Sequence, residues 1–190
     1  MVSALKKSPM SRQSLLPLLA AHVLAKGLGQ ASLRPLARAA GTSDRMLLYH
    51  FGSKNALIAE LLAFIAANYA SALDAALAGD RPTTRSAVIS RIIAHTHSPA
   101  MQPFLSLWWE IVAGAARGED SYRAAAYSMM HELLAWLEGQ MPVGDPDPKG
   151  GARYLLTLIE GSLMLAAIGH EETAQAGLEA GLLAGGAAPA

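Results

Sequence analysis

The sequence contains no cysteine, which excludes disulfide bonds and thiolate metal sites and favours a reducing compartment. It is also poor in strand signals, because no sustained alternation of β-branched and aromatic residues and no Asn-Gly or Asp-Gly hairpin turn occurs. The longest uncharged apolar stretch, residues 61–73, is shorter than the roughly 18 residues that a membrane span requires. The N-terminus lacks the apolar region of a secretion signal, so we expect a cytoplasmic protein with no membrane partner.

Catalytic and metal-binding motifs are missing as well. His95 and His97 are two positions apart, so on a helix they point in nearly opposite directions and cannot bind one ion. His131-Glu132 begins like a zinc-protease motif, but Ala135 stands where the second histidine is required. No nucleophile elbow, phosphate-binding loop or dinucleotide fingerprint occurs. We therefore predict no enzymatic activity, no metal and no cofactor.

What the chain does have is helix signals and apolar residues. The 190 residues are 52% hydrophobic, which is enough for a sizeable core. Cap residues, glycines and apolar spacings of three and four predict an all-α fold of about nine helices. These helices are expected over residues 11–26, 32–40, 42–51, 53–78, 83–97, 101–116, 121–140, 150–168 and 171–184, with Pro142–Gly151 as the clearest loop.

The charges of opposite sign are segregated along the chain. Residues 1–60 hold eight basic and two acidic groups, a net charge of +6, and the remaining residues therefore carry −6 because the chain is neutral overall. A basic module is suited to a polyanion, whereas an acidic one is not. The sequence thus predicts two domains, residues 1–62 with a flexible basic tail at 1–10, and residues 63–190.

The front of the chain has helix-turn-helix spacing. Two short helices, over 33–40 and 44–51, are separated by Gly41, which can adopt the positive φ that a tight turn requires. Helices of two turns are unstable alone, so the first and fourth helices must complete their core with Leu15, Leu19, Val23, Leu57 and Leu61.

The run "LRPLARAAGTSDRMLLYHFGSKNALIAELL" (Leu33–Leu62) resembles the DNA-binding domain of TetR-type transcriptional regulators. The resemblance is carried by the Ala40-Gly41 turn, by Tyr49-His50-Phe51 and by Ser53-Lys54 with Leu57 behind them, and it covers about residues 11–62. It implies an N-terminal three-helix DNA-binding domain and a C-terminal helical bundle for ligand binding and dimerisation. It also implies a homodimer on a palindromic operator that releases double-stranded DNA when a small-molecule effector binds.

By position, the resemblance implies a set of DNA-contacting residues. Tyr49, His50 and Lys54 would contact phosphates, and Arg45 and Met46 would face bases. Leu48 stands where many members carry a tyrosine that contacts the DNA backbone, so we expect that one contact to be missing. The full predicted set is Ser32, Thr42, Ser43, Arg45, Met46, Tyr49, His50 and Lys54.

The acidic half offers two further predictions. An apolar helix rich in aromatic residues, together with nearby methionines, is typical either of plain core or of an effector pocket. The candidate pocket residues are Met101, Phe104, Trp108, Trp109, Glu110, Met129, Met130 and His131. Small and apolar residues at helical spacing in the last two helices predict a four-helix dimer interface about a two-fold axis. The candidate interface residues are Leu155, Ile159, Ser162, Leu163, Ala166, Gly177, Leu178, Gly181 and Leu182.

The leading interpretation is therefore a ligand-responsive DNA-binding repressor. An activator, or a regulator that senses a protein instead of a small molecule, would have the same DNA-binding module. An all-helical adaptor whose basic face binds an acidic protein is the alternative from another class. Such an adaptor would show steep salt dependence without sequence preference.

Overall fold

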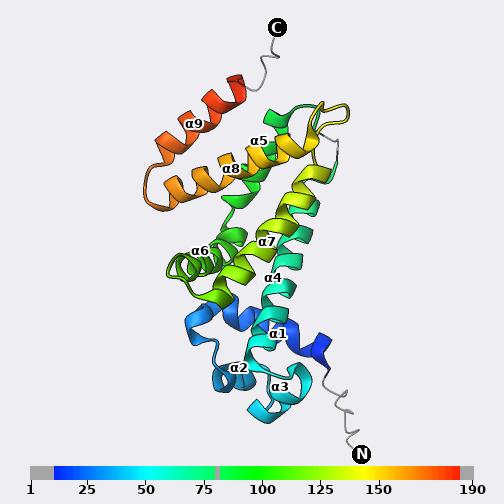
Figure 1. The fold of residues 1–190 in the computed structure, drawn as a ribbon, viewed down its shortest axis with the longest axis vertical. Helices are drawn as coiled ribbons and strands as arrows, with labels where there is room; N and C mark the ends of the chain where they lie inside the picture. Colours follow the sequence, from blue (N-terminus) through cyan, green and yellow to red (C-terminus); the bar gives the residue numbers. More distant parts are fainter. Residues whose placement is uncertain (1–10, 80–81, 185–190) are drawn as a thin grey trace, which may run out of the picture. The chain divides into compact units, whose positions relative to one another are not determined.

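The computed structural model describes residues 11–79 and 82–184, without the side chains of residues 76 and 181–184. Within these ranges the chain forms nine α-helices, two 3-10 helices and no strand, which confirms the predicted all-α fold (Figure 1). The α-helices are α1 Arg12–Lys26, α2 Leu33–Ala39, α3 Asp44–Phe51, α4 Lys54–Ala76, α5 Arg85–Thr96, α6 Gln102–Ala116, α7 Asp120–Gly139, α8 Pro148–Ala167 and α9 Glu171–Ala184. The 3-10 helices are η1 Leu28–Gln30 and η2 Pro99–Met101.

The chain is organised in two compact units. Among the described residues, the first contains 11–69 and Gln102–Tyr127, and the second contains 70–79, 82–101 and 128–184. This division differs from a simple cut after residue 62, because α6 packs with α1 and therefore joins the N-terminal helices in the first unit. Sequence reasoning cannot anticipate this, since α6 begins 76 positions after α1 ends.

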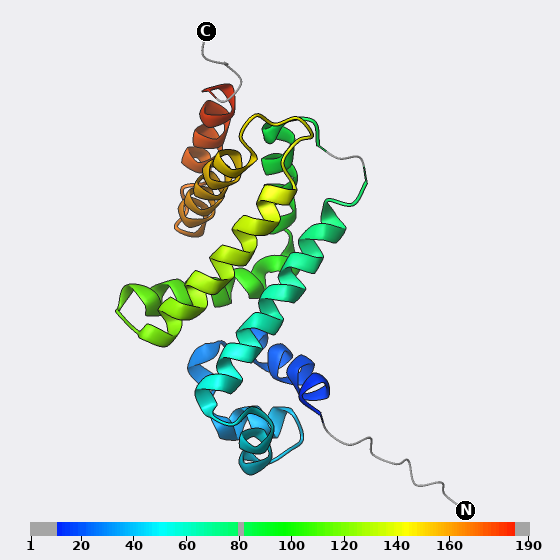
Figure 2. The ribbon, with the colours of Figure 1, turned by 45° about the vertical axis from the view of Figure 1, so that its right-hand side comes forward.

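The core of the first unit lies where α1, α2 and α3 gather around the first turns of α4, as Figures 1 and 2 show. Each short helix contributes its apolar side to this core. Full burial of one such leucine stabilises the fold by about 1.5–3 kcal/mol, which the two-turn helices need because they are unstable alone. The buried residues include all five that were expected to complete the core, Leu15, Leu19, Val23, Leu57 and Leu61, together with Leu36, Leu47 and Phe51.

Helix α1 begins and ends at the predicted residues. Ser11 accepts a hydrogen bond from the Ser14 amide and forms a reciprocal capping box with the Ser14 side chain. Gly27, with φ +79°, ends the helix and donates its N–H to the Val23 carbonyl. The helix continues through Pro17, whose missing N–H costs one backbone hydrogen bond.

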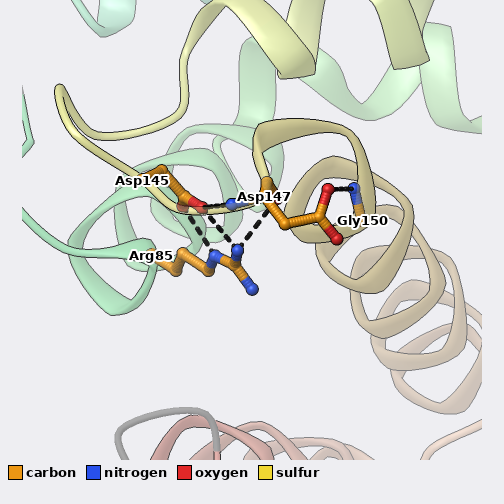
Figure 3. A network of polar contacts seen from close by, with 4 residues as sticks. All are labelled: Arg85, Asp145, Asp147 and Gly150. Atoms are coloured by element: carbon orange, nitrogen blue, oxygen red, sulfur yellow. Dashed lines mark hydrogen bonds and ion pairs between the residues drawn. The ribbon is translucent and has the colours of Figure 1, made fainter. Parts of the chain in front are cut away.

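In the second unit, α8 and α9 pack against each other as a helical hairpin, and α5 packs on α8. An ion pair fastens the start of α5 to the segment before α8 (Figure 3). The Arg85 guanidinium donates two hydrogen bonds to the Asp145 carboxylate, at 2.7 and 2.6 Å, and a third to the Asp147 carbonyl at 3.0 Å. The Arg85 hydrogen bond holds the pKa of the Asp145 carboxyl below its usual value, although burial acts in the opposite direction.

Helix α8 begins earlier than the sequence indicates. Pro148 stands in its first turn, where a missing N–H costs nothing, and Asp147 caps it by accepting from the Gly150 amide at 2.9 Å. Gly150 and Gly151 are therefore helical rather than part of the loop. A Cβ on Gly151 would lie 2.7 Å from the Arg85 guanidinium carbon, so a larger residue here would require the Arg85 side chain to shift.

Within the described residues, one helix is long and apolar enough to cross a membrane by length and composition alone, namely Lys54–Ala75 of α4. Its length differs from that of the uncharged stretch 61–73, because Lys54–Ala75 includes the charged residues Lys54, Glu60 and Asp74. In the structure, Leu57, Leu61, Ile65 and Leu73 of α4 are buried among the other helices.

Candidate nucleic-acid interface

Helices α2 and α3 are joined by a tight turn that the local sequence dictates. Gly41 adopts φ +64°, and the Thr42 N–H donates to the Ala37 carbonyl at 2.9 Å. Ser43 then caps α3 by accepting a hydrogen bond from the Met46 amide at 3.3 Å. Gly52, with φ +80°, ends α3 after two turns. These signals fix both ends of α3, so its register and its exposed face are determined.

Helix α3 has two distinct faces. Leu47 and Phe51 are buried, at 0% and 3% exposure, and attach the helix to the core of the first unit. Tyr49 is 79% exposed, and Arg45 and Met46 lie with it on the outward side. The outward face thus carries a guanidinium, a phenol and a thioether at the surface of the basic end of the chain.

Leu48, which the sequence alone does not assign to a face, is 38% exposed. It lies one turn from Asp44, on the flank of the outward face rather than in the core. An apolar side chain at this position cannot donate to a phosphate, so Leu48 does not replace the tyrosine contact that the resemblance implies.

The other predicted contact residues fall into two groups. Ser32, Ser43 and Lys54 are exposed, and the Ser32 side chain makes no capping hydrogen bond with α2. Thr42 and His50 are half-buried: the Thr42 hydroxyl oxygen and the His50 Nε2 are enclosed and have no hydrogen-bond partner within the described residues. The His50 ring also packs edge-on against Tyr49, with ring centroids 5.3 Å apart. The structure therefore presents the first group to a ligand more openly than the second.

Glu110 has a role that the sequence does not reveal. Its carboxylate accepts hydrogen bonds from the amides of Leu28 and Gly29, at 2.6 and 3.2 Å, and so binds α6 to the connection between α1 and α2. A Cβ at Gly27 would lie 2.9 Å from the Glu110 carboxylate. The glycines on either side of Leu28 are the one sequence signal of this close approach. The Glu110 carboxylate thus binds main-chain amides of the first unit.

The remaining candidate pocket residues are divided between the two units. Phe104, Trp108 and Trp109 lie on α6 in the first unit, where the Phe104 ring packs against Tyr69 with centroids 5.7 Å apart. The second unit contains Met101, Met129, Met130 and His131. The effector pocket therefore stays a prediction.

Most of the candidate dimer-interface residues face the interior of the second unit. Leu155, Ile159, Ser162, Leu163 and Leu178 are buried, Ala166 is half-buried and Gly177 is exposed. The side chains of Gly181 and Leu182 lie outside the described residues. The buried set packs α8 against its neighbours in the same chain, so a second copy of the chain would have to meet a different side of α8.

A helix-turn-helix whose second helix exposes Arg45 and Tyr49, at the basic end of an all-helical chain, defines a DNA-binding regulator. Comparisons with known proteins specify the family. The model of the bacterial regulatory proteins of the tetR family matches residues 19–61. The chain is 31% identical over 168 residues to the HTH-type transcriptional regulator BetI of Pseudomonas fluorescens Pf-5, covering 84% of this chain and 83% of that protein. The chain therefore belongs to the TetR family of transcriptional regulators.

Solved structures agree with this fold. The transcriptional regulator SCO7518 from Streptomyces coelicolor A3(2) matches with a TM-score of 0.69 and 24% identity, over 89% of this chain and 94% of its own. A regulator from Saccharomonospora viridis, solved in complex with choline, matches with a TM-score of 0.59 and 18% identity, over 88% and 93% of the two chains. Because members of this family are transcriptional regulators and not enzymes, the prediction of a non-enzymatic function is confirmed.

Proposed function

We propose that the chain is a ligand-responsive repressor that binds a palindromic operator as a homodimer in the cytoplasm. The observation that carries the proposal is the outward face of α3, where Tyr49 is 79% exposed beside Arg45 and Met46. A helix of this kind fits the major groove, where arginine reads guanine and apolar groups contact the thymine methyl. In this proposal, residues 1–62 bind DNA and residues 63–190 bind the effector and the second subunit.

The proposed contacts divide by chemistry. Arg45 and Met46 face bases, whereas Tyr49 and Lys54 bind phosphates, which fix the position of the helix without reading sequence. Ser32 and Ser43 add hydroxyl donors near the N-terminal ends of α2 and α3, where the helix dipole favours an anion. His50 and Thr42 contribute less, because their buried polar atoms do not face outward.

A second face of α8 supports the homodimer. Positions at alternating spacings of four and three carry apolar or small residues along a side of the helix that neighbours the buried one, about 120° around the axis from it. Ile168 is 63% exposed and Met164, beside this face, is 47% exposed. Exposed apolar side chains at this spacing are what an isologous helical interface requires. We define the dimer face as Tyr154, Leu158, Gly161, Leu165 and Ile168.

Ile168→Lys is expected to convert the dimer to a monomer. A two-fold axis repeats the substitution in both subunits, so two ammonium groups would be desolvated in one apolar contact. Val143→Lys is the matched control, because Val143 is 83% exposed in the loop before α8. Analytical ultracentrifugation measures the result. If the dimer of the Ile168→Lys variant were as stable as the dimer of the Val143→Lys variant, this interface would be wrong.

The proposed effector is a small molecule that binds through the aromatic residues of α6. Phe104, Trp108 and Trp109 are half-buried aromatic residues of α6, and aromatic rings bind quaternary ammonium groups through their faces. Choline, which is present in the Saccharomonospora viridis structure, is therefore the first ligand to test. Since coupling between two sites is reciprocal, a ligand that releases DNA must also bind more weakly when DNA is bound.

A reporter assay tests the repressor assignment. A duplex selected by the purified protein is placed between a promoter and a reporter gene. We expect the protein to lower reporter expression, and added effector to restore it. An increase in expression on adding the protein would instead identify an activator. Loss of repression without any small molecule, on adding a second protein, would identify a protein-responsive regulator.

A further inference from the structure

We propose that Arg12 is a positioning residue for DNA recognition, which holds the C-terminal end of α3 in place and does not bind DNA itself. The inference rests on the proposed role of α3 in reading the operator. Arg12 is not in the predicted set of DNA-contacting residues. In the sequence it is one of the eight basic residues of 1–60.

One side chain from α1 contacts both α3 and α4. The Nε of Arg12 donates a hydrogen bond to the main-chain carbonyl of His50, near the end of α3. The Nη1 donates to the Oε1 of Glu60, on α4, at 2.9 Å. The guanidinium carbon also lies 5.8 Å from the centre of the Phe51 ring, within the range of a cation–π contact. Arg12 therefore connects three helices of the first unit.

The position of these contacts on α3 gives them their importance. His50 is the penultimate residue of α3, and the last four carbonyls of a helix have no partner inside it. A cation at this end also interacts favourably with the helix dipole. Because α3 has only eight residues, its direction depends on contacts with neighbours rather than on its own stability. Leu47 and Phe51 attach its inner side, and Arg12 fixes its C-terminal end.

The same contacts pair the charge of Arg12 with a carboxylate of its own chain. The guanidinium is paired with Glu60, and both side chains remain partly exposed, at 55% and 37%. An exposed pair of this kind adds little to global stability. The loss of Arg12 should therefore appear in DNA recognition, through a displaced α3, much more than in thermal unfolding. A lysine cannot replace it, because a single ammonium lacks the fork that serves a carbonyl and a carboxylate together.

The test compares Arg12→Ala, Arg12→Lys and Glu60→Gln with the wild-type chain on a duplex that the wild type has selected. We expect both Arg12 variants to weaken sequence-specific binding by about three- to tenfold, the scale of one broken network contact. The slope of log affinity against log salt concentration should not change, because no phosphate contact is lost. Glu60→Gln should cause a smaller loss, and adding it to Arg12→Ala should cause no further loss.

Lys54→Ala is the control for a phosphate contact, and it should lower the salt slope by about one. A similar fall in slope for Arg12→Ala, or wild-type affinity for Arg12→Lys, would show that Arg12 acts as a charge on DNA and overturn the inference. Unchanged affinity in both Arg12 variants would overturn it as well. If the wild type selects no sequence, the proposed function itself fails and this inference fails with it. Melting temperatures of all variants identify any general unfolding.

Discussion

Arg45→Ala is expected to reduce affinity for a selected operator by about 5- to 150-fold, since one good arginine–base contact is worth about 1–3 kcal/mol. Arg45 is exposed on the outward face of α3, whereas Leu47 and Phe51 are the residues that attach the helix to the core. The melting temperature should therefore remain that of the wild type, and the preference for one base pair in each half-site should relax. Binding measured on duplexes that vary one base pair at a time checks both points.

Arg153→Ala is the matched control for Arg45→Ala, because it removes an exposed guanidinium from α8 in the second unit. It should leave operator affinity unchanged. If Arg45→Ala instead weakened binding to every duplex equally and lowered the salt slope by about one, Arg45 would be a phosphate contact. The assignment of base reading to this face would then be wrong.

Asp145→Asn is expected to destabilise the protein by about 2–4 kcal/mol, slightly below the usual cost of breaking a buried ion pair because Arg85 retains partial exposure. The Asp145 side chain is only 3% exposed, compared with 30% for Arg85. An amide would turn one pair of acceptor sites into donors that face the guanidinium (Figure 3). The melting temperature should fall by roughly 4–16 °C. Glu132→Gln, at an exposed carboxylate, should change it little.

The same ion pair predicts a pH dependence. The folded pKa of Asp145 lies below its unfolded value of about 3.9, because the Arg85 hydrogen bond favours the carboxylate. The unfolded chain therefore binds the proton first, and the contribution to stability is present above that value and lost as pH falls through the folded pKa. Unfolding measured between pH 6 and pH 3 should show the wild type approaching the Asp145→Asn variant. An equal difference between the two at every pH would contradict this account.

The fold and the α3 face could be predicted from the sequence because their signals are local. Ser11, Gly27, Gly41 and Ser43 mark helix ends through interactions with residues a few positions away. The alternation of Leu47 and Phe51 with Arg45 and Tyr49 is a property of one short helix. Local rules of capping and periodicity apply directly to such patterns.

Long-range contacts could not be predicted in the same way. Arg12 meets His50 and Glu60 across 38 and 48 positions, and Glu110 meets Leu28 across 82. In the sequence, each of these residues is indistinguishable from an ordinary surface charge. Its partner becomes known only from the packing of the helices. The buried face of α8 shows the same limit, because periodicity identifies an apolar face but not the helix that covers it.

The most direct test of the account is selection of bound duplexes from a random pool by the purified full-length chain. A homodimer that presents one α3 from each subunit should enrich an inverted repeat whose half-site centres are about 34 Å, one turn of DNA, or a multiple of it apart. The Arg45→Ala variant should recover the same repeat with one position relaxed. Enrichment of no sequence, with binding that simply declines as salt rises, would contradict the claim that α3 reads DNA and would favour an adaptor whose basic face binds polyanions.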